Sequence, residues 1–138
     1  MIYFLIVTYK ECFRDSTAFK SLINLNVSTK QNLKVFSFHN SSNQNLPAIN
    51  RQIEGIDTYE ISSQLNLGLA GGYNALLELI DKLQPKGVIF LNADCVVTEM
   101  YFQQVFKNMS TSKIIVPRLI SKKKQISPFN KRGFDYIF

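Results

Sequence analysis

The opening of the chain most constrains its fold, because residues 2–7 form an unbroken run of β-branched, aromatic and other apolar side chains. Such a strand is apolar on both faces, which is typical of a parallel strand that helices cover on each side. The run is too short to cross a membrane, and it lacks the basic segment that opens a signal peptide. These features predict a helix-covered sheet in a cytoplasmic protein.

Apolar spacing predicts that strands alternate with helices along the chain. Apolar side chains recur at helical spacing in residues 18–23 and 73–83, and Asp15 or Ser16 is placed to cap the first of these helices. Further strands are expected at residues 33–38, 58–61, 88–91 and 114–116, and a further helix at residues 102–109. This order predicts an α/β fold with a three-layer, mostly parallel sheet.

Composition limits the class of protein further. The chain has 138 residues, of which 46% are hydrophobic and 19% charged, so one globular domain is expected and intrinsic disorder is disfavoured. Its formal charge of +6 favours anionic partners. A nucleic-acid partner is not expected, because the basic residues are scattered apart from Lys122, Lys123 and Lys124. Cys12 and Cys95 match no metal-binding spacing and are expected to be free thiols.

Polar residues follow the predicted strands at the point where each strand ends. They are Thr8 and Tyr9, His39 and Asn40, residues 66–68, and residues 92–94. Because the carboxyl ends of parallel strands meet at one edge of a sheet, we expect these segments to converge there around a ligand.

Two common nucleotide-binding motifs are absent from the sequence. A dinucleotide-binding turn needs glycines directly after the first strand, and residues 8–12 contain none. The glycine-rich stretch at residues 68–72 lacks the Gly-Lys-Ser/Thr of a Walker A loop. This stretch precedes a predicted helix, whose unpaired N–H groups and dipole would favour phosphate. Close packing of the helix on a strand would explain the same glycines, so both interpretations stay open.

Asn92 and Asp94 come directly after a predicted buried strand. A carboxylate and an amide oxygen at this spacing suit a hard divalent cation that also binds diphosphate oxygens. A cation held there would neutralise charge on a departing nucleoside diphosphate. The structural alternative is that Asp94 caps the helix that follows.

Taken together, these segments resemble the N-terminal half of family 2 glycosyltransferases, which have the GT-A fold, a Rossmann-like fold for nucleotide-diphospho-sugars. The matching segments are residues 6–9 (IVTY), 38–42 (FHNSS), 66–74 (NLGLAGGYN) and 90–97 (FLNADCVV). The third is similar to the N-x-G-x-A-G-G-x-N of rhamnosyltransferase-like members. The resemblance covers residues 2–118 and implies one nucleotide-sugar-binding domain over residues 1–138, in which the basic residues 119–138 begin an acceptor region.

The resemblance also implies a role for each matching residue in a metal-assisted, inverting sugar transfer. Thr8 and Tyr9 would line the pocket of the nucleotide base, with His39 and Asn40 at the neighbouring strand end. The ribose and diphosphate would be cradled by Asn66, Gly68, Gly71, Gly72 and Asn74. Asp94, helped by Asn92, would hold Mg²⁺ or Mn²⁺ on the diphosphate of a UDP- or dTDP-linked donor. The acceptor would be a polysaccharide or a lipid-linked saccharide.

Some features depart from the family pattern. His39 stands where many members have an aspartate that accepts an N–H of uracil or thymine, and Asn92 replaces an acid of the metal motif. No general base is identified, because Asp135 matches no family motif. We expect either a truncated enzyme or a complete short protein that binds nucleotide sugar and needs a partner for the base. Self-association through an exposed sheet edge and peripheral contact with the inner membrane face are further expectations.

Overall fold

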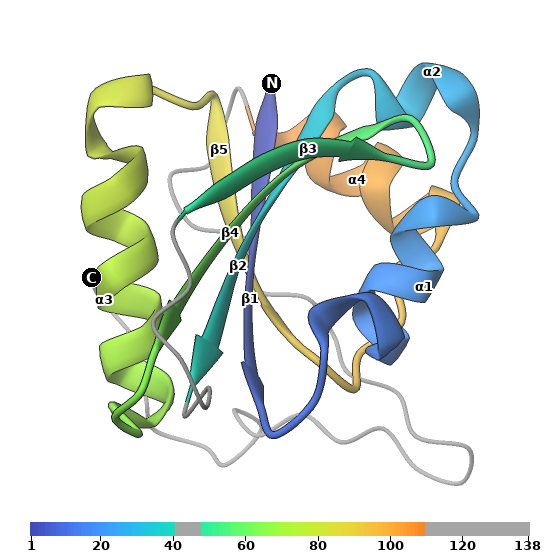
Figure 1. The fold of residues 1–138 in the computed structure, drawn as a ribbon. Coiled ribbons are helices and arrows are strands. Elements are labelled where there is room, and N and C mark those ends of the chain that lie inside the picture. Colours follow the sequence, from blue (N-terminus) through green and yellow to red (C-terminus); the bar gives the residue numbers. More distant parts are fainter. Residues whose placement is uncertain (41–47, 110–138) are drawn as a thin grey trace, which may run out of the picture.

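The computed structural model describes residues 1–40 and 48–109. Within these ranges the chain forms one five-stranded sheet in the order β3-β4-β2-β1-β5, with helices on both faces (Figure 1). The strands are β1 (Ile2–Tyr9), β2 (Leu33–Asn40), β3 (Ile49–Ile53), β4 (Ile56–Ser63) and β5 (Gly87–Asn92). The helices are η1 (Phe13–Asp15), α1 (Thr17–Ile23), α2 (Val27–Lys30), α3 (Gly68–Ile80), η2 (Asp81–Leu83) and α4 (Glu99–Asn108). The predicted three-layer α/β fold is confirmed.

The sheet is mostly parallel, as predicted, but its outer strand β3 was not expected. Strands β1, β2, β4 and β5 pair in parallel, whereas β3 pairs with β4 in the antiparallel sense. Glu54 and Gly55 connect β3 to β4 with positive φ angles of 48° and 83°. Positive φ at both central residues is the geometry of a tight β-hairpin turn. Strand β3 has few apolar residues, so it lacks the pattern on which the other strands were predicted.

Strand β1 lies at the centre of the core and is buried on both faces, as its apolar run predicted. Ile2, Phe4 and Ile6 belong to a cluster that includes Phe19 of α1 and Phe102 of α4. The alternate residues of β1 belong to a second cluster with Leu76 and Ile80 of α3. In Figure 1, α3 accordingly covers one face of the sheet, and α1 and α4 cover the other.

Two helix starts decide between alternatives that the sequence left open. The Ser16 hydroxyl accepts a hydrogen bond from the backbone N–H of Phe19, so Ser16 rather than Asp15 caps α1. Helix α3 begins at Gly68, so the glycine-rich stretch opens the helix as its first turn, as predicted. The strand predicted at residues 114–116 lies outside the described residues.

Both cysteines are free thiols, as predicted. None of the helices in the described part of the chain has the length and the apolar character needed to span a bilayer.

Candidate functional site

The carboxyl ends of the parallel strands lie side by side at one edge of the sheet, the lower edge in Figure 1. Tyr9 at the end of β1 is in register with Asn40 of β2, and Asn40 is in register with Ser63 of β4. On the other side of β1, Val7 is in register with Asn92 of β5. The predicted convergence of these strand ends is therefore confirmed.

Asn40 fastens the start of α3 to the end of β2. Its side-chain nitrogen donates to the carbonyl of Gly68 at 3.1 Å, and its side-chain oxygen accepts from the N–H of Leu67 at 2.7 Å. The Asn66 side chain closes the same turn by accepting from the N–H of Gly68 at 2.9 Å. Asn40 is also buried, with 3% of its surface exposed. Asn40 and Asn66 therefore hold the loop that leads into α3.

The glycines at the start of α3 serve different purposes. Gly68 has a φ of +69°, which favours glycine, and apart from its chain neighbours and the backbone of its own helix no atom lies within 4 Å of where its Cβ would be. A Cβ on Gly72 would lie 2.8 Å from Cγ1 of Val7 and 3.1 Å from Cδ1 of Phe38. Gly72 thus lets α3 pack directly on β1 and β2, which is the packing interpretation. A direct role of Gly72 in a ligand cradle stays a prediction.

Asp94 and Asn92 are both exposed at the end of β5. The Thr98 hydroxyl accepts from the N–H of Tyr101 and caps α4, so the interpretation of Asp94 as the helix cap is wrong. The nearest side-chain partner given by the structure for the Asp94 carboxylate is Sγ of Cys95, at 4.0 Å. Within residues 1–40 and 48–109, Asp94 takes part in no ion pair. Its carboxylate is therefore available to a ligand.

Asn92 and Asp94 could supply part of a cation's coordination shell. Among the described residues there is no group of three His, Cys, Asp or Glu side chains that would complete a metal site on its own. Mg²⁺ is commonly bound through one or two carboxylates, with water and substrate phosphates filling the other positions. One exposed carboxylate beside one amide oxygen fits a shared site of that kind.

Tyr73 connects α3 to the end of β5. Its hydroxyl lies 3.5 Å from Oδ1 of Asn92, and its ring makes an edge contact with Phe90 at a centroid distance of 5.1 Å. Burial raises the pKa of Tyr73 to about 12, with a further contribution from Cys95. Burial, and then the neighbouring Asp94, also raise the pKa of the Cys95 thiol. Both groups are therefore protonated at neutral pH, and Tyr73 can donate a hydrogen bond to Asn92.

Thr8 and Tyr9 end β1 with opposite exposures. Thr8 is 1% exposed, and its hydroxyl oxygen has no hydrogen-bond partner among the described residues. Tyr9 is 49% exposed, and the Lys10 ammonium lies 5.1 Å from the centre of its ring. Thr8 is in register with His39, which is partly buried on β2. Tyr9 thus offers an aromatic surface at the edge of the sheet, next to Asn40 of β2.

A hollow beside His39 contains polar residues that sequence analysis missed. It is a small hollow of about 40 Å³ and is lined by Cys12, Phe13, Ser37, His39, Ile49, Glu60, Ile61 and Ser62. The polar lining comes from alternate positions on β2 and β4. An alternation of polar residues at the ends of these strands was the available signal, but only the pairing of β2 with β4 brings the two sets together.

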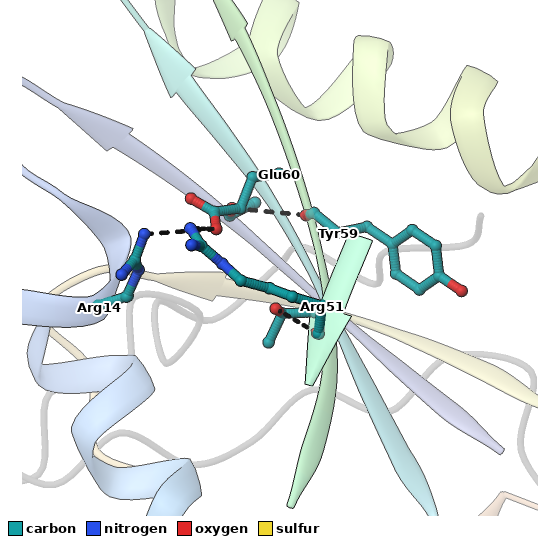
Figure 2. Close-up of polar contacts among 6 residues, drawn as sticks. Arg14, Arg51, Tyr59 and Glu60 are labelled. Carbon is teal, nitrogen blue, oxygen red and sulfur yellow. Dashed lines mark hydrogen bonds and ion pairs between the residues drawn. The ribbon is translucent and has the colours of Figure 1, made fainter. Parts of the chain in front are cut away.

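Glu60 joins two arginines from separate elements. Figure 2 shows Arg14 of η1 and Arg51 of β3 approaching its carboxylate from different directions. The Arg14 contact is an ion pair of 3.8 Å, and the Arg51 contact is a hydrogen-bonded ion pair. This cluster links η1, which follows Thr8 and Tyr9, to β3 and β4.

A family model described as glycosyl transferase family 2 matches residues 3–134. The chain belongs to glycosyl transferase family 2. Comparison with curated proteins and with solved structures gives no match. Membership of this family agrees with the mostly parallel sheet, which is consistent with the GT-A fold. The family match supports a glycosyltransferase.

The predicted site residues of this glycosyltransferase fall into two groups. Asn40, Asn66 and Gly72 are engaged in the structure of the β2–α3 corner. The other predicted residues differ in exposure: Tyr9, Gly68, Asn74, Asn92 and Asp94 are exposed, His39 and Gly71 are partly buried, and Thr8 is buried. Gly71 also meets a packing requirement, because a Cβ there would lie 2.7 Å from Cβ of Leu67.

Proposed function

We propose that this glycosyltransferase takes its sugar from a nucleoside-diphospho-sugar bound along the carboxyl edge of the sheet. The donor is UDP- or dTDP-linked, and the acceptor is a polysaccharide or a lipid-linked saccharide. The observation that carries the proposal is the availability of Asp94, since Thr98 caps the helix that Asp94 could have capped. An exposed carboxylate at a ligand-binding edge, with only the weakly donating Cys95 thiol as a side-chain partner among the described residues, supports a role in binding.

The start of α3 is the proposed position of the diphosphate. No side chain caps this helix at Leu67, and Asn40 and Asn66 bind only the N–H groups of Leu67 and Gly68. The next N–H groups of the first turn have no partner within the helix and carry the positive end of its dipole. Phosphate oxygens are suitable acceptors for these groups.

Asp94 and Asn92 are the residues that would hold Mg²⁺ or Mn²⁺. When bound, such a cation neutralises the negative charge that develops on the departing diphosphate. Asn92 would contribute an uncharged oxygen, and donor phosphates would have to supply much of the remaining coordination. Tyr73 keeps Asn92 in place by donating from its protonated hydroxyl. The site thus joins β5 and α3 around one ligand.

The finer features of the reaction rest on the resemblance of residues 66–74 to rhamnosyltransferase-like members. It supports a hexosyl-type transfer in polysaccharide synthesis. The described residues bind and orient the donor in this proposal, and none of them is assigned as the general base of the acceptor hydroxyl.

A thermal-shift panel tests the proposal. UDP, dTDP, GDP, ADP and NAD are each added with and without Mn²⁺. Ligand at about 100 times its dissociation constant adds roughly 2.7 kcal/mol of stability, enough to raise Tm by several degrees. We expect a Mn²⁺-dependent rise with UDP or dTDP, and none with NAD. Absence of a rise with every nucleotide diphosphate would contradict the donor site.

A transfer assay then separates an enzyme from a module that only binds. Release of free UDP or dTDP from the corresponding nucleotide sugar is measured with the protein and a polysaccharide or lipid-linked saccharide acceptor, without a second protein. Turnover supports the transferase, whereas nucleotide binding without any release would support the binding module.

A further inference from the structure

The hollow beside η1 combines apolar walls with a small group of converging polar side chains. Phe13 is only 3% exposed and forms part of the wall together with Ile49. The register pairs Ser37 with Glu60, and His39 with Ser62, so the polar residues form two successive rows across β2 and β4. Apolar walls with a few polar groups are typical of sites that bind a small ligand.

Glu60 is the carboxylate of this hollow. Its side chain is 19% exposed, and both arginines contact the same oxygen, Oε1. A carboxylate has about four lone-pair sites, which exceeds the number used by two arginine contacts. No hydrogen bond to Oε2 from any described residue is present. Glu60 can therefore accept a further N–H from a ligand while it remains paired with Arg14 and Arg51.

We propose that Glu60 reads the base of the nucleotide donor. The proposal rests on the donor site proposed above, because the hollow lies beside Thr8 and Tyr9 at the same edge of the sheet. An ion-paired carboxylate only accepts hydrogen bonds, and a ring N–H suits it better than the amino group of adenine or cytosine, which lies beside an acceptor ring nitrogen. Uracil, thymine and guanine carry such an N–H. The ring nitrogens on the corresponding edge of adenine and cytosine are acceptors and would face the carboxylate unfavourably.

His39 assists this recognition without replacing it. A neutral imidazole has one N–H donor, which can reach a carbonyl beside the ring N–H of the base. The chain has His39 where many family members have an aspartate, and Glu60 lies diagonally adjacent to it, on the next strand. Glu60 thus supplies from β4 the carboxylate that β2 lacks at this position.

The experiment compares the affinities of UDP, dTDP, GDP, ADP and CDP, all with Mn²⁺, by isothermal titration. Wild-type protein should bind at least one nucleotide with a ring N–H about 10-fold or more tightly than ADP and CDP. Glu60→Gln should weaken that binding by about 10- to 100-fold, in line with the 1.5–3 kcal/mol contribution of hydrogen bonds to charged groups. The affinity for ADP and CDP should change little, so the preference should largely disappear.

Two control variants separate base recognition from loss of an ion pair. Arg51→Met breaks the Arg51–Glu60 pair but leaves the carboxylate, and it should keep the base preference. Asp57→Asn breaks the Lys34–Asp57 pair of 3.3 Å on the same two strands, and it should bind every nucleotide like the wild type. Circular dichroism of each variant verifies its fold.

The outcomes distinguish this inference from the proposed donor site. Equal affinity of the wild type for all five nucleotides would overturn the proposal that Glu60 recognises the base. This outcome can be seen with the wild-type protein alone. An unchanged preference in Glu60→Gln, or an equal loss of preference in Arg51→Met, would also overturn it while the donor site stands. Failure of the wild type to bind any of these nucleotides would contradict the donor site itself, and base reading with it.

Discussion

The β2–α3 corner and the β5–α4 loop meet the same edge of the sheet but use their polar groups in opposite ways. At the corner, Asn40 is buried and both ends of its amide bind backbone groups of Leu67 and Gly68. In the loop, Asp94 is exposed, and Thr98 makes the capping bond of α4 in its place. The corner fixes the shape of the edge, whereas the loop leaves a charge available. The motif residues at this edge therefore divide into those that hold the shape of the site and those that are available to bind a ligand.

The largest expected effect is that of Gly72→Val. The new side chain would meet Val7 and Phe38 at distances that packed atoms do not adopt, so α3 must move off the sheet. We expect a loss of about 3 kcal/mol in the free energy of unfolding, at the upper end for overpacked cores. Urea denaturation measures it, with Ala70→Val on the exposed side of the same turn as a control. A stable Gly72→Val variant that has lost nucleotide affinity would instead support the cradle interpretation.

Asn40→Ala should have the next largest effect. It leaves the N–H of Leu67 and the carbonyl of Gly68 without their side-chain partner at a partly buried position. Loss of such bonds costs about 1–3 kcal/mol. Denaturation of Asn74→Ala, an exposed position on α3, gives the matched comparison and should show little change. Equal stability of the two variants would show that Asn40 does not hold the corner.

Thr98→Ala and Asp94→Ala test the loop in the same way. Removal of the Thr98 cap should cost about 1 kcal/mol of stability. Asp94→Ala should stay within about 0.5 kcal/mol of the wild type, as expected for an exposed residue whose side-chain contact with the Cys95 thiol is long and weak. If Asp94→Ala were as destabilising as Thr98→Ala, Asp94 would have a structural role that the contacts do not show.

The smallest effect concerns Glu99 and depends on pH. Hydrogen bonds from Thr29 and from the backbone N–H of Asn26 lower the pKa of Glu99 below its ordinary value of 4.5. Because the pKa is lower in the folded state, ionised Glu99 stabilises the fold fully at pH values above the ordinary pKa. This stabilisation is lost as the pH falls through the folded-state pKa. Glu99→Gln should therefore be slightly less stable than the wild type at pH 7, and the difference should shrink below pH 4.5. A difference that grows on acidification would contradict this assignment.

Strands could be predicted from the sequence where burial gives them an apolar pattern. Polar features that depend on strand pairing, such as strand β3 and the position of Glu60, could not. The apolar runs of β1 and β5 indicated parallel strands, and their polar ends indicated the edge that binds ligand. Strand β3 was missed because its half-exposed side chains resemble a loop. Glu60 was missed because its approach to His39 depends on the register between β2 and β4, which no local pattern specifies.

The motif residues also show how spacing predicts position better than role. Asn40 and Gly72 lie at the edge where the resemblance places them, but both have a structural role. Asn40 binds backbone groups at the start of α3, and Gly72 lets α3 pack closely on the sheet. For Asp94, the capping alternative could be excluded only once Thr98 was seen to bind the N–H of Tyr101. The sequence motif alone is compatible with either a structural or a ligand-binding role for each of these residues, and only the contacts distinguish them.

Isothermal titration of UDP and dTDP, with and without Mn²⁺, tests the central claim that Asp94 is the available binding carboxylate. Wild-type protein is compared with Asp94→Asn and with Asp81→Asn, an exposed aspartate at the opposite end of α3. The account predicts that Mn²⁺ strengthens nucleotide binding by about tenfold or more, about 1.4 kcal/mol, in the wild type and in Asp81→Asn, but not in Asp94→Asn. The same Mn²⁺ dependence in Asp94→Asn would contradict it.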